Sequence, residues 1–260
     1  KHRRDTGTVP SLIKRSFFDA SLARLNISVF SLHFMLMAGF VVLPLILEQR
    51  LGLDRSQHWL AYLPALLLSI AGMVPLMILG ERKGRLKIAF IIAVSLLIAS
   101  QLLMGSAAGD WWFYTGMWLF FIGFNYLEAT LPSLISKTVY AGGKGTALGV
   151  YSTFQFLGAF AGGAAGGLAM QAAGSDGVFA ICIVVALIWM VVAFTIKPPK
   201  SVTNHVFTLD EDESQWRETL QQLESAKGVE ELLLLVEERT VYLKVDEQLF
   251  NRELLNPLRA

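Results

Sequence analysis

Long apolar runs separated by short polar segments dominate the first 200 residues of this chain. A helix crosses a hydrocarbon core about 30 Å thick with roughly 20 residues, because each residue adds about 1.5 Å. Six runs reach that length with few charges, and they cover residues 25–47, 57–79, 87–108, 111–136, 146–173 and 177–196. The pattern therefore predicts an all-α membrane bundle of six transmembrane helices over residues 25–196, after a lead-in at 1–24.

The pattern changes after Pro198 and Pro199, where residues 197–204 form a predicted linker. Residues 205–260 then mix short alternating stretches with helical ones. The predicted elements are a strand at 205–209, a helix at 215–227 with Trp216, Leu220 and Leu223 on one face, an apolar run at 229–236, a strand at 240–245 with Val241, Leu243 and Val245 on one face, and a helix at 247–258. This βαββα order predicts a small α+β domain of the split βαβ type.

Charge placement predicts how the helices are oriented. Hydrophobic residues make up 54% of the chain and charged residues 17%. Cytoplasmic loops of membrane proteins are enriched in Lys and Arg. Fourteen basic residues fall on the lead-in, the second and fourth connections and the segment after the last span, whereas Arg50 and Arg55 fall on the opposite side. Both ends of the chain, and the tail domain, are therefore predicted to be cytoplasmic.

Several classes of protein are not expected from this composition. Cys182 is the single cysteine, and the four histidines show no zinc-ligand spacing, so we predict no disulfide framework and no metal site. No nucleophile and base occur in a recognisable arrangement, and we predict no enzyme activity, no catalytic residue and no cofactor. Nucleic acid is not an expected partner. The chain starts at Lys1 rather than Met, which suggests a piece of a longer protein.

A short motif between the second and third runs reads Gly-Glu-Arg-Lys-Gly-Arg-Leu-Lys from Gly80. Its composition fits an ordinary positively charged cytoplasmic loop. It also resembles the loop signature Gly-x-x-x-Asp-Arg-x-Gly-Arg-Arg of the major facilitator superfamily. Arg82, Gly84 and Arg85 match, Glu81 stands where Asp is usual, Leu86 replaces the last Arg, and the leading Gly would fall on Met77.

This resemblance implies more than the motif itself. Six spans with both ends cytoplasmic look like the carboxy-terminal half of a twelve-helix transporter of that superfamily, with a ferredoxin-like domain appended. The expected partners are then lipid, an amino-terminal six-helix half, protons and a small-molecule substrate. The resemblance also implies alternating access, proton coupling and a location in the bacterial inner membrane.

Ionisable side chains at membrane depth are costly, so each is a candidate for function. Glu128 is the one carboxylate deep within a predicted span, and it shares a helical stripe with Trp118, Phe121 and Asn125. We predict that Glu128 carries a proton, with Asn125 and Tyr126 as hydrogen-bond partners. The alternative is a structural carboxylate paired with a helix end or with an Arg of the other half.

Other polar side chains in the spans have weaker signals. Histidine changes charge near neutral pH, so His33 could join a proton relay or simply bond to a neighbouring helix. Tyr151 and Gln155, one turn apart, are candidates for the wall of a substrate cavity or for bonds between helices. Gln101 is assigned to packing.

Glycines recur every four residues in the fifth run, at Gly158, Gly162 and Gly166. Such spacing lets two helix backbones approach closely, and we predict a helix-packing face here.

The resemblance to the major facilitator superfamily implies a secondary active transporter, and with it we expect export of a small, amphipathic solute in exchange for protons. The alternative is a membrane receptor or scaffold that does not transport and whose spans anchor a cytoplasmic sensing domain.

Overall fold

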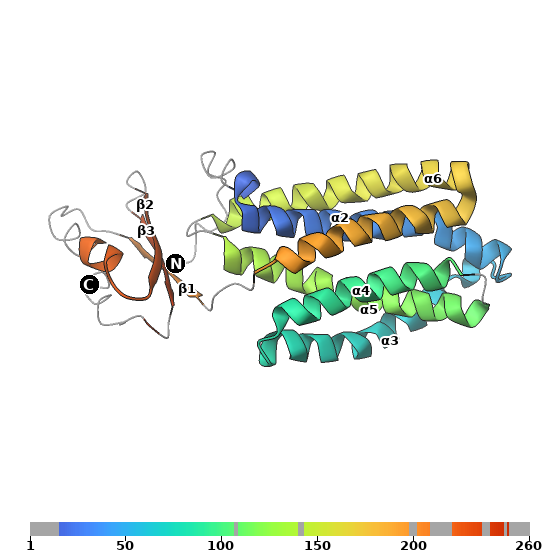
Figure 1. The fold of residues 1–260 in the computed structure, drawn as a ribbon, viewed down its shortest axis with the longest axis horizontal. Coiled ribbons are helices and arrows are strands. Elements are labelled where there is room, and N and C mark those ends of the chain that lie inside the picture. Colours follow the sequence, from blue (N-terminus) through green and yellow to red (C-terminus); the bar gives the residue numbers. More distant parts are fainter. Residues whose placement is uncertain are drawn as a thin grey trace. The chain divides into compact units, whose positions relative to one another are not determined.

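The computed structural model describes residues 16–106, 109–139, 143–197, 202–208, 220–235, 240–246 and 249. Its long helices lie side by side in Figure 1. They are α2 (Ala20–Gln49), α3 (Trp59–Met77), α4 (Leu86–Met104), α5 (Asp110–Thr138) and α6 (Lys144–Thr195), with a short 3-10 helix η1 (Arg55–Gln57) and a π-helix η2 (Ile78–Arg82). The chain divides into two compact units, one made of Asp19–Ser133 and Val150–Pro198 and the other of the remaining residues.

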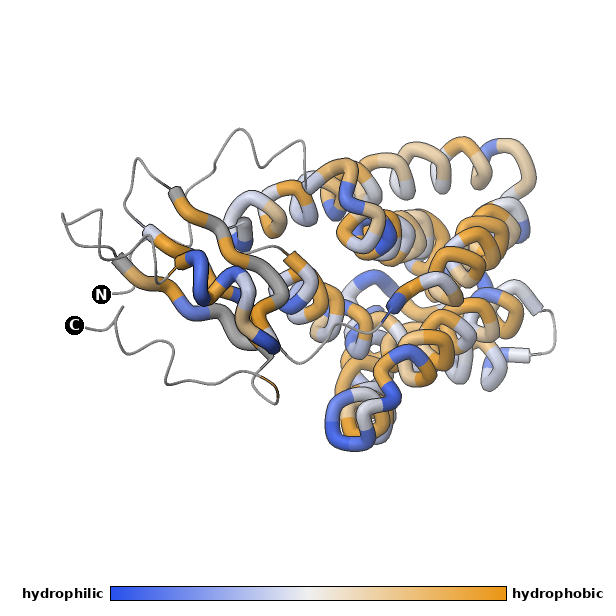
Figure 2. Tube along the Cα trace, turned by 60° about the vertical axis from the view of Figure 1, so that its left-hand side comes forward, coloured by the Kyte–Doolittle hydropathy of each residue, from blue (hydrophilic) through white to orange (hydrophobic). Residues whose placement is uncertain are grey.

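All five long helices are apolar enough to cross a membrane. Large apolar side chains remain exposed along them, including Leu67 and Leu68 of α3 and Phe156 and Phe160 of α6. Figure 2 shows the same property as apolar colour around most of each helix, with polar residues gathered mainly at the helix ends. A helix that is apolar on all sides is typical of a membrane span. The prediction of an apolar helical bundle is therefore confirmed at this level.

Helix α2 begins five residues earlier than the apolar run predicted. The Asp19 carboxylate accepts hydrogen bonds from the backbone N–H groups of Ser21 and Leu22, both at 2.9 Å. These groups have no partner within the helix, so an aspartate at this position fixes the start of a helix. The polar residues that follow Asp19 are thus the first turns of α2 and not part of an irregular lead-in.

Helix α6 contains 52 residues but is interrupted near its middle. Ala173 and Gly174 have non-helical backbone angles, and Gly174 has a positive φ of 63°. Only glycine adopts such angles without strain. The chain reverses direction there, so that the two stretches of α6 run side by side in Figure 1. The break lies where the sequence predicted one span to end and another to begin, at 173 and 177.

The first stretch of α6 packs directly on the backbone of α2. A Cβ atom placed on Gly158 would overlap the backbone of Phe30, and one on Gly162 would overlap that of Phe34. At Gly166 the same atom would lie 2.9 Å from the Cα atom of Ala38. The three glycines, spaced by four along α6, thus face three residues with the same spacing along α2. Because glycine has no side chain, the two helix backbones can approach closely.

The tail is described by itself. Strands β1 (Val202–Thr208), β2 (Val229–Leu235) and β3 (Thr240–Asp246) form one sheet in the order β1-β3-β2. Strand β3 is antiparallel to both neighbours, so β1 and β2 run parallel on either side of it. Val241, Leu243 and Val245 pack with Leu220 and Leu223 in a small core, which is the face predicted from the alternation.

Residues 220–224 are helical, whereas residues 215–219 of the helix predicted at 215–227, and all but one residue of that predicted at 247–258, lie outside the described residues. The unit that contains the sheet also contains the end of α5. There the Lys244 ammonium donates to the backbone oxygens of Lys137, Thr138 and Val139, at 3.2, 3.4 and 2.8 Å. A lysine so placed satisfies carbonyl groups that a helix leaves unpaired at its end.

Candidate functional site

Three helices bring polar side chains together inside the apolar bundle. The His33 Nε2 atom of α2 lies 3.7 Å from a carboxylate oxygen of Glu128 on α5, and 2.9 Å from the Gln155 amide nitrogen of α6. Glu128 is ten residues from the end of α5 at Thr138, or about 15 Å, and His33 and Gln155 are about 16–20 Å from the starts of their helices. The three side chains therefore meet near the middle of the spans.

The hydrogen bonds determine the proton positions on His33. Its Nδ1 atom lies 3.2 Å from the backbone oxygen of Val29, which can only accept, so Nδ1 carries a hydrogen. The Gln155 amide nitrogen can only donate, so the Nε2 atom that faces it accepts. This pair of contacts matches the imidazole tautomer that carries its hydrogen on Nδ1. A second proton on Nε2 would require Gln155 to turn its amide by half a rotation or to move away.

Gln155 connects the two titratable groups, since its amide nitrogen also lies 3.5 Å from the Glu128 Oε1 atom. The other carboxylate oxygen, Oε2, is buried and has no hydrogen-bond partner among the described residues. The Glu128 side chain as a whole is 37% exposed, against 11% for His33. The oxygen that faces the histidine is thus buried, although the Glu128 side chain as a whole is partly exposed.

Tyr151 lies one turn before Gln155 and is 4% exposed. Its hydroxyl is buried without a partner in the described part of the chain. A buried hydroxyl without a partner costs about 1–3 kcal/mol, so such a group is a candidate for binding water or substrate.

Among the hydrogen bonds of the described residues, none joins Asn125 or Tyr126 to Glu128 as predicted. The Asn125 amide instead donates to the Ser69 hydroxyl of α3 at 2.7 Å. Tyr126 is two residues from Glu128, so it points to another side of α5, where its hydroxyl bonds to Thr130. The polar contacts of α5 therefore fall into separate groups, and His33, Glu128, Gln155 and Tyr151 form one of them.

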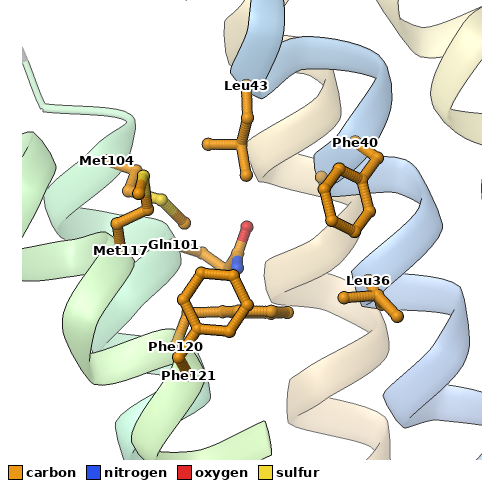
Figure 3. A pocket seen from close by; sticks show the side chains of 9 residues that line it. Leu36, Phe40, Leu43, Gln101, Met104, Met117, Phe120 and Phe121 are labelled. Carbon is orange, nitrogen blue, oxygen red and sulfur yellow. The ribbon is translucent and has the colours of Figure 1, made fainter. Parts of the chain in front are cut away.

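Trp118 and Phe121, which were predicted on the same helical stripe, also lie in different surroundings. Trp118 is 37% exposed, whereas Phe121 is 4% exposed and lines a pocket between α2, α4 and α5 (Figure 3).

Two polar side chains of the bundle, Ser69 and Gln101, carry no functional signal in the sequence. Ser69 is one small polar residue in an apolar run, with no signal that Asn125 pairs with it. Gln101 was assigned to packing, yet its amide oxygen is buried without a partner in the described residues.

The loop motif begins within the π-helix η2, which includes Glu81 and Arg82. Gly84 has a φ of 63°, so the chain turns there in a conformation that favours glycine, and Arg85 precedes the first residue of α4. Gly80 is buried in η2, and a Cβ atom on it would lie 2.8 Å from the Tyr126 hydroxyl oxygen. Tyr126 of α5 therefore packs against the backbone at the first residue of the motif.

This contact predicts the effect of substituting Gly80. We expect Gly80→Ala to lower the free energy of unfolding by about 1–2 kcal/mol, because the added methyl group overlaps a rigid tyrosine. Removing the hydroxyl by Tyr126→Phe in the Gly80→Ala protein should recover most of that loss, measured as thermal unfolding in detergent. Equal and additive losses from the two substitutions would contradict the contact.

Comparison with known proteins identifies the class. A family model described as Major Facilitator Superfamily matches residues 25–238. The chain belongs to the major facilitator superfamily, and the resemblance to this family that the sequence suggested is confirmed.

Individual relatives are transport proteins by name. The chain is similar to "Inner membrane transport protein YajR" of Escherichia coli (strain K12), with 35% identity over 250 residues that cover 96% of this chain and 55% of that protein. "Uncharacterized transporter BU466" of Buchnera aphidicola subsp. Acyrthosiphon pisum (strain APS) is 32% identical over 140 residues, or 54% of this chain and 36% of that protein. The chain spans about half the length of the curated relatives it matches.

Proposed function

We propose that the chain is the carboxy-terminal half of a secondary transporter of the inner membrane, and that it exports a small solute in exchange for protons. The observation that carries the coupling proposal is the contact of His33, Glu128 and Gln155 in mid-span. Family membership and the similarity to a protein named as an inner membrane transport protein support transport.

The geometry gives the proton step a physical form. With the Gln155 nitrogen facing His33, the imidazole is neutral and the amide also donates toward the carboxylate. A proton that arrives on the Glu128 carboxylate removes the need for that donation. A proton that arrives on His33 Nε2 requires the opposite amide orientation, or a direct pairing with the carboxylate oxygen 3.7 Å away. Gln155 would therefore have two orientations, each matched to one proton arrangement.

Six crossings complete the proposed topology. A continuous 52-residue helix would be about 78 Å long, more than twice the bilayer core. The break at Ala173 and Gly174 divides it into two stretches that each suffice for one crossing. With the Lys and Arg distribution of the sequence, both ends and a tail of ferredoxin-like type would then be cytoplasmic. An amino-terminal half would cover the open side of Glu128.

Transport and proton coupling can be tested together. The full-length protein is reconstituted into liposomes and loaded with a panel of small amphipathic amines, and efflux is followed with and without an imposed pH gradient. We expect at least one solute to leave faster with the gradient in the exchange direction than without it, since one pH unit supplies about 1.4 kcal/mol of driving force per proton. Transport that ignores the gradient would remove proton coupling. The absence of any transport, with an intact fold, would favour the receptor or scaffold.

A further inference from the structure

The outer face of the tail sheet is covered, although the core of the tail lies on the other face. Side chains alternate along β3, so Tyr242 and Lys244 point away from the core face that Val241, Leu243 and Val245 form. Such a second face of an antiparallel sheet is commonly open to solvent. Tyr242 is nevertheless 4% exposed. Another part of the chain therefore lies against β3 on this outer face, which carries Tyr242 and Lys244.

Lys244 identifies a segment that this face contacts. Its ammonium group donates to the backbone oxygens of Lys137, Thr138 and Val139, which are the last two residues of α5 and the one that follows. These residues belong to the same compact unit as the sheet, and Val139 is 1% exposed. The end of a helix has unpaired carbonyl groups and a partial negative charge, so an ammonium group forms charge-assisted hydrogen bonds there.

The connection between α6 and the sheet favours this contact within one chain. Helix α6 ends at Thr195 and β1 begins at Val202, so the Cα atoms of these residues are at most about 25 Å apart. The ends of α5 and α6 are both on the predicted cytoplasmic side. A short tether gives the sheet a high effective concentration at the helix end, so that a few hydrogen bonds suffice to hold it. The end of α5 in the same chain is therefore favoured over that of a second copy.

We propose that the tail sheet is an internal clamp on α5, which holds the cytoplasmic end of this helix through Lys244 and thereby slows transport. The effect on transport rests on the proposed function. Glu128 lies ten residues before the end of the same helix at Thr138. A helix held at its end shifts or tilts only after the hydrogen bonds that hold it are broken. The cost of breaking them adds to the barrier of each step that moves the end of α5, and release of the clamp removes that cost.

Distance measurements between two spin labels in the full-length protein test the docking. The labels replace Glu224 of the tail and Lys137 of α5, whose side chains are exposed, in a protein that carries Cys182→Ser. We expect one narrow distribution of distances. Lys244→Met keeps the length of the side chain and removes the donors, so it should broaden this distribution. Lys227→Met is the matched control, because Lys227 is an exposed lysine of the tail, and it should leave the distribution narrow.

Two further measurements separate docking from other causes. Labels at Glu224 and at Val206, which is 51% exposed on β1, report on the tail itself, and their distance should stay narrow in Lys244→Met. Dilution of the doubly labelled protein with unlabelled protein should leave the distance between positions 224 and 137 unchanged. Loss of that distance on dilution would mean that the sheet docks on a second copy, and would overturn the proposal. A broad distribution for this pair without the Lys244→Met substitution would also overturn it, whatever the variants show.

Exchange of labelled for unlabelled solute across liposome membranes tests the effect on transport. Lys244→Met should speed exchange about tenfold, equivalent to about 1.4 kcal/mol of barrier, close to what one hydrogen bond to a charged group contributes. Lys227→Met should leave the rate unchanged. Unchanged or slower exchange in Lys244→Met, with the tail released, would overturn the clamp. If the protein without these substitutions transports no solute, the proposed function fails, and the distance measurements still decide whether the sheet holds α5.

Discussion

Gly162→Ala is expected to destabilise the bundle strongly. The added methyl group would overlap the Phe34 backbone of α2, and neither backbone can move away without separating the two helices. Overpacking of this kind costs about 1–3 kcal/mol, and here the loss should exceed the gain of nearly 1 kcal/mol that alanine brings to a helix interior. The melting temperature in detergent, followed by circular dichroism, should fall by several degrees.

Gly163→Ala is the matched control. It makes the same change one position along α6, where a Cβ atom would have no neighbour within 4 Å. Its melting temperature should stay the same or rise, because helix propensity is then the main effect. Transport activity should likewise fall in Gly162→Ala and be retained in Gly163→Ala. Phe34 adjoins His33, so moving α2 away from α6 also lengthens the His33–Gln155 contact. Similar melting temperatures for the two variants would contradict the described packing.

The features predicted correctly from the sequence are those that hydrophobicity and backbone geometry determine, namely the long helices and the buried face of one strand. The apolar runs identified the long helices, and the alternation at Val241, Leu243 and Val245 identified the buried face of β3. Helix ends were less accurate, because they depend on single groups such as the Asp19 carboxylate. The spacing of Gly158, Gly162 and Gly166 predicted a close contact but not its partner, because nothing in a glycine pattern specifies α2 rather than another helix.

The candidate site shows the same limit. Glu128 and His33 could be identified from the sequence because ionisable groups are costly inside a membrane span, and Gln155 because it lies one turn after Tyr151. That these three side chains contact one another depends on the packing of three helices, which the sequence does not specify. The sequence assigned Asn125 to Glu128 because they share a face of α5, whereas Ser69 of α3 provides the nearer partner. Gln101 was assigned to packing, and the sequence contains no sign that the Ser100 hydroxyl would leave the Gln101 amide oxygen buried without a partner among the described residues.

Glu128→Gln is expected to abolish the effect of the pH gradient on transport. Glutamine has nearly the same shape and can still accept a hydrogen bond from Gln155, but it cannot take up or release a proton. Efflux from liposomes in the presence of the gradient should fall to the rate measured without it, because no proton movement then drives the exchange. Exchange of labelled for unlabelled solute without a gradient should continue, since it requires substrate movement but no net proton movement.

Glu48→Gln provides the control for loss of a carboxylate. Glu48 pairs with Arg55 at 3.2 Å near the end of α2, where the Arg55 side chain is 82% exposed, and such surface pairs contribute about 0–1 kcal/mol. Gradient-driven efflux should therefore be unchanged in this variant. If Glu128 has only a structural role, Glu128→Gln should lower the melting temperature and slow both gradient-driven efflux and exchange. Retained gradient dependence in Glu128→Gln, with a normal melting temperature, would show that another group carries the proton. The separate loss of coupling, with exchange intact, is the result that the His33–Glu128–Gln155 geometry predicts.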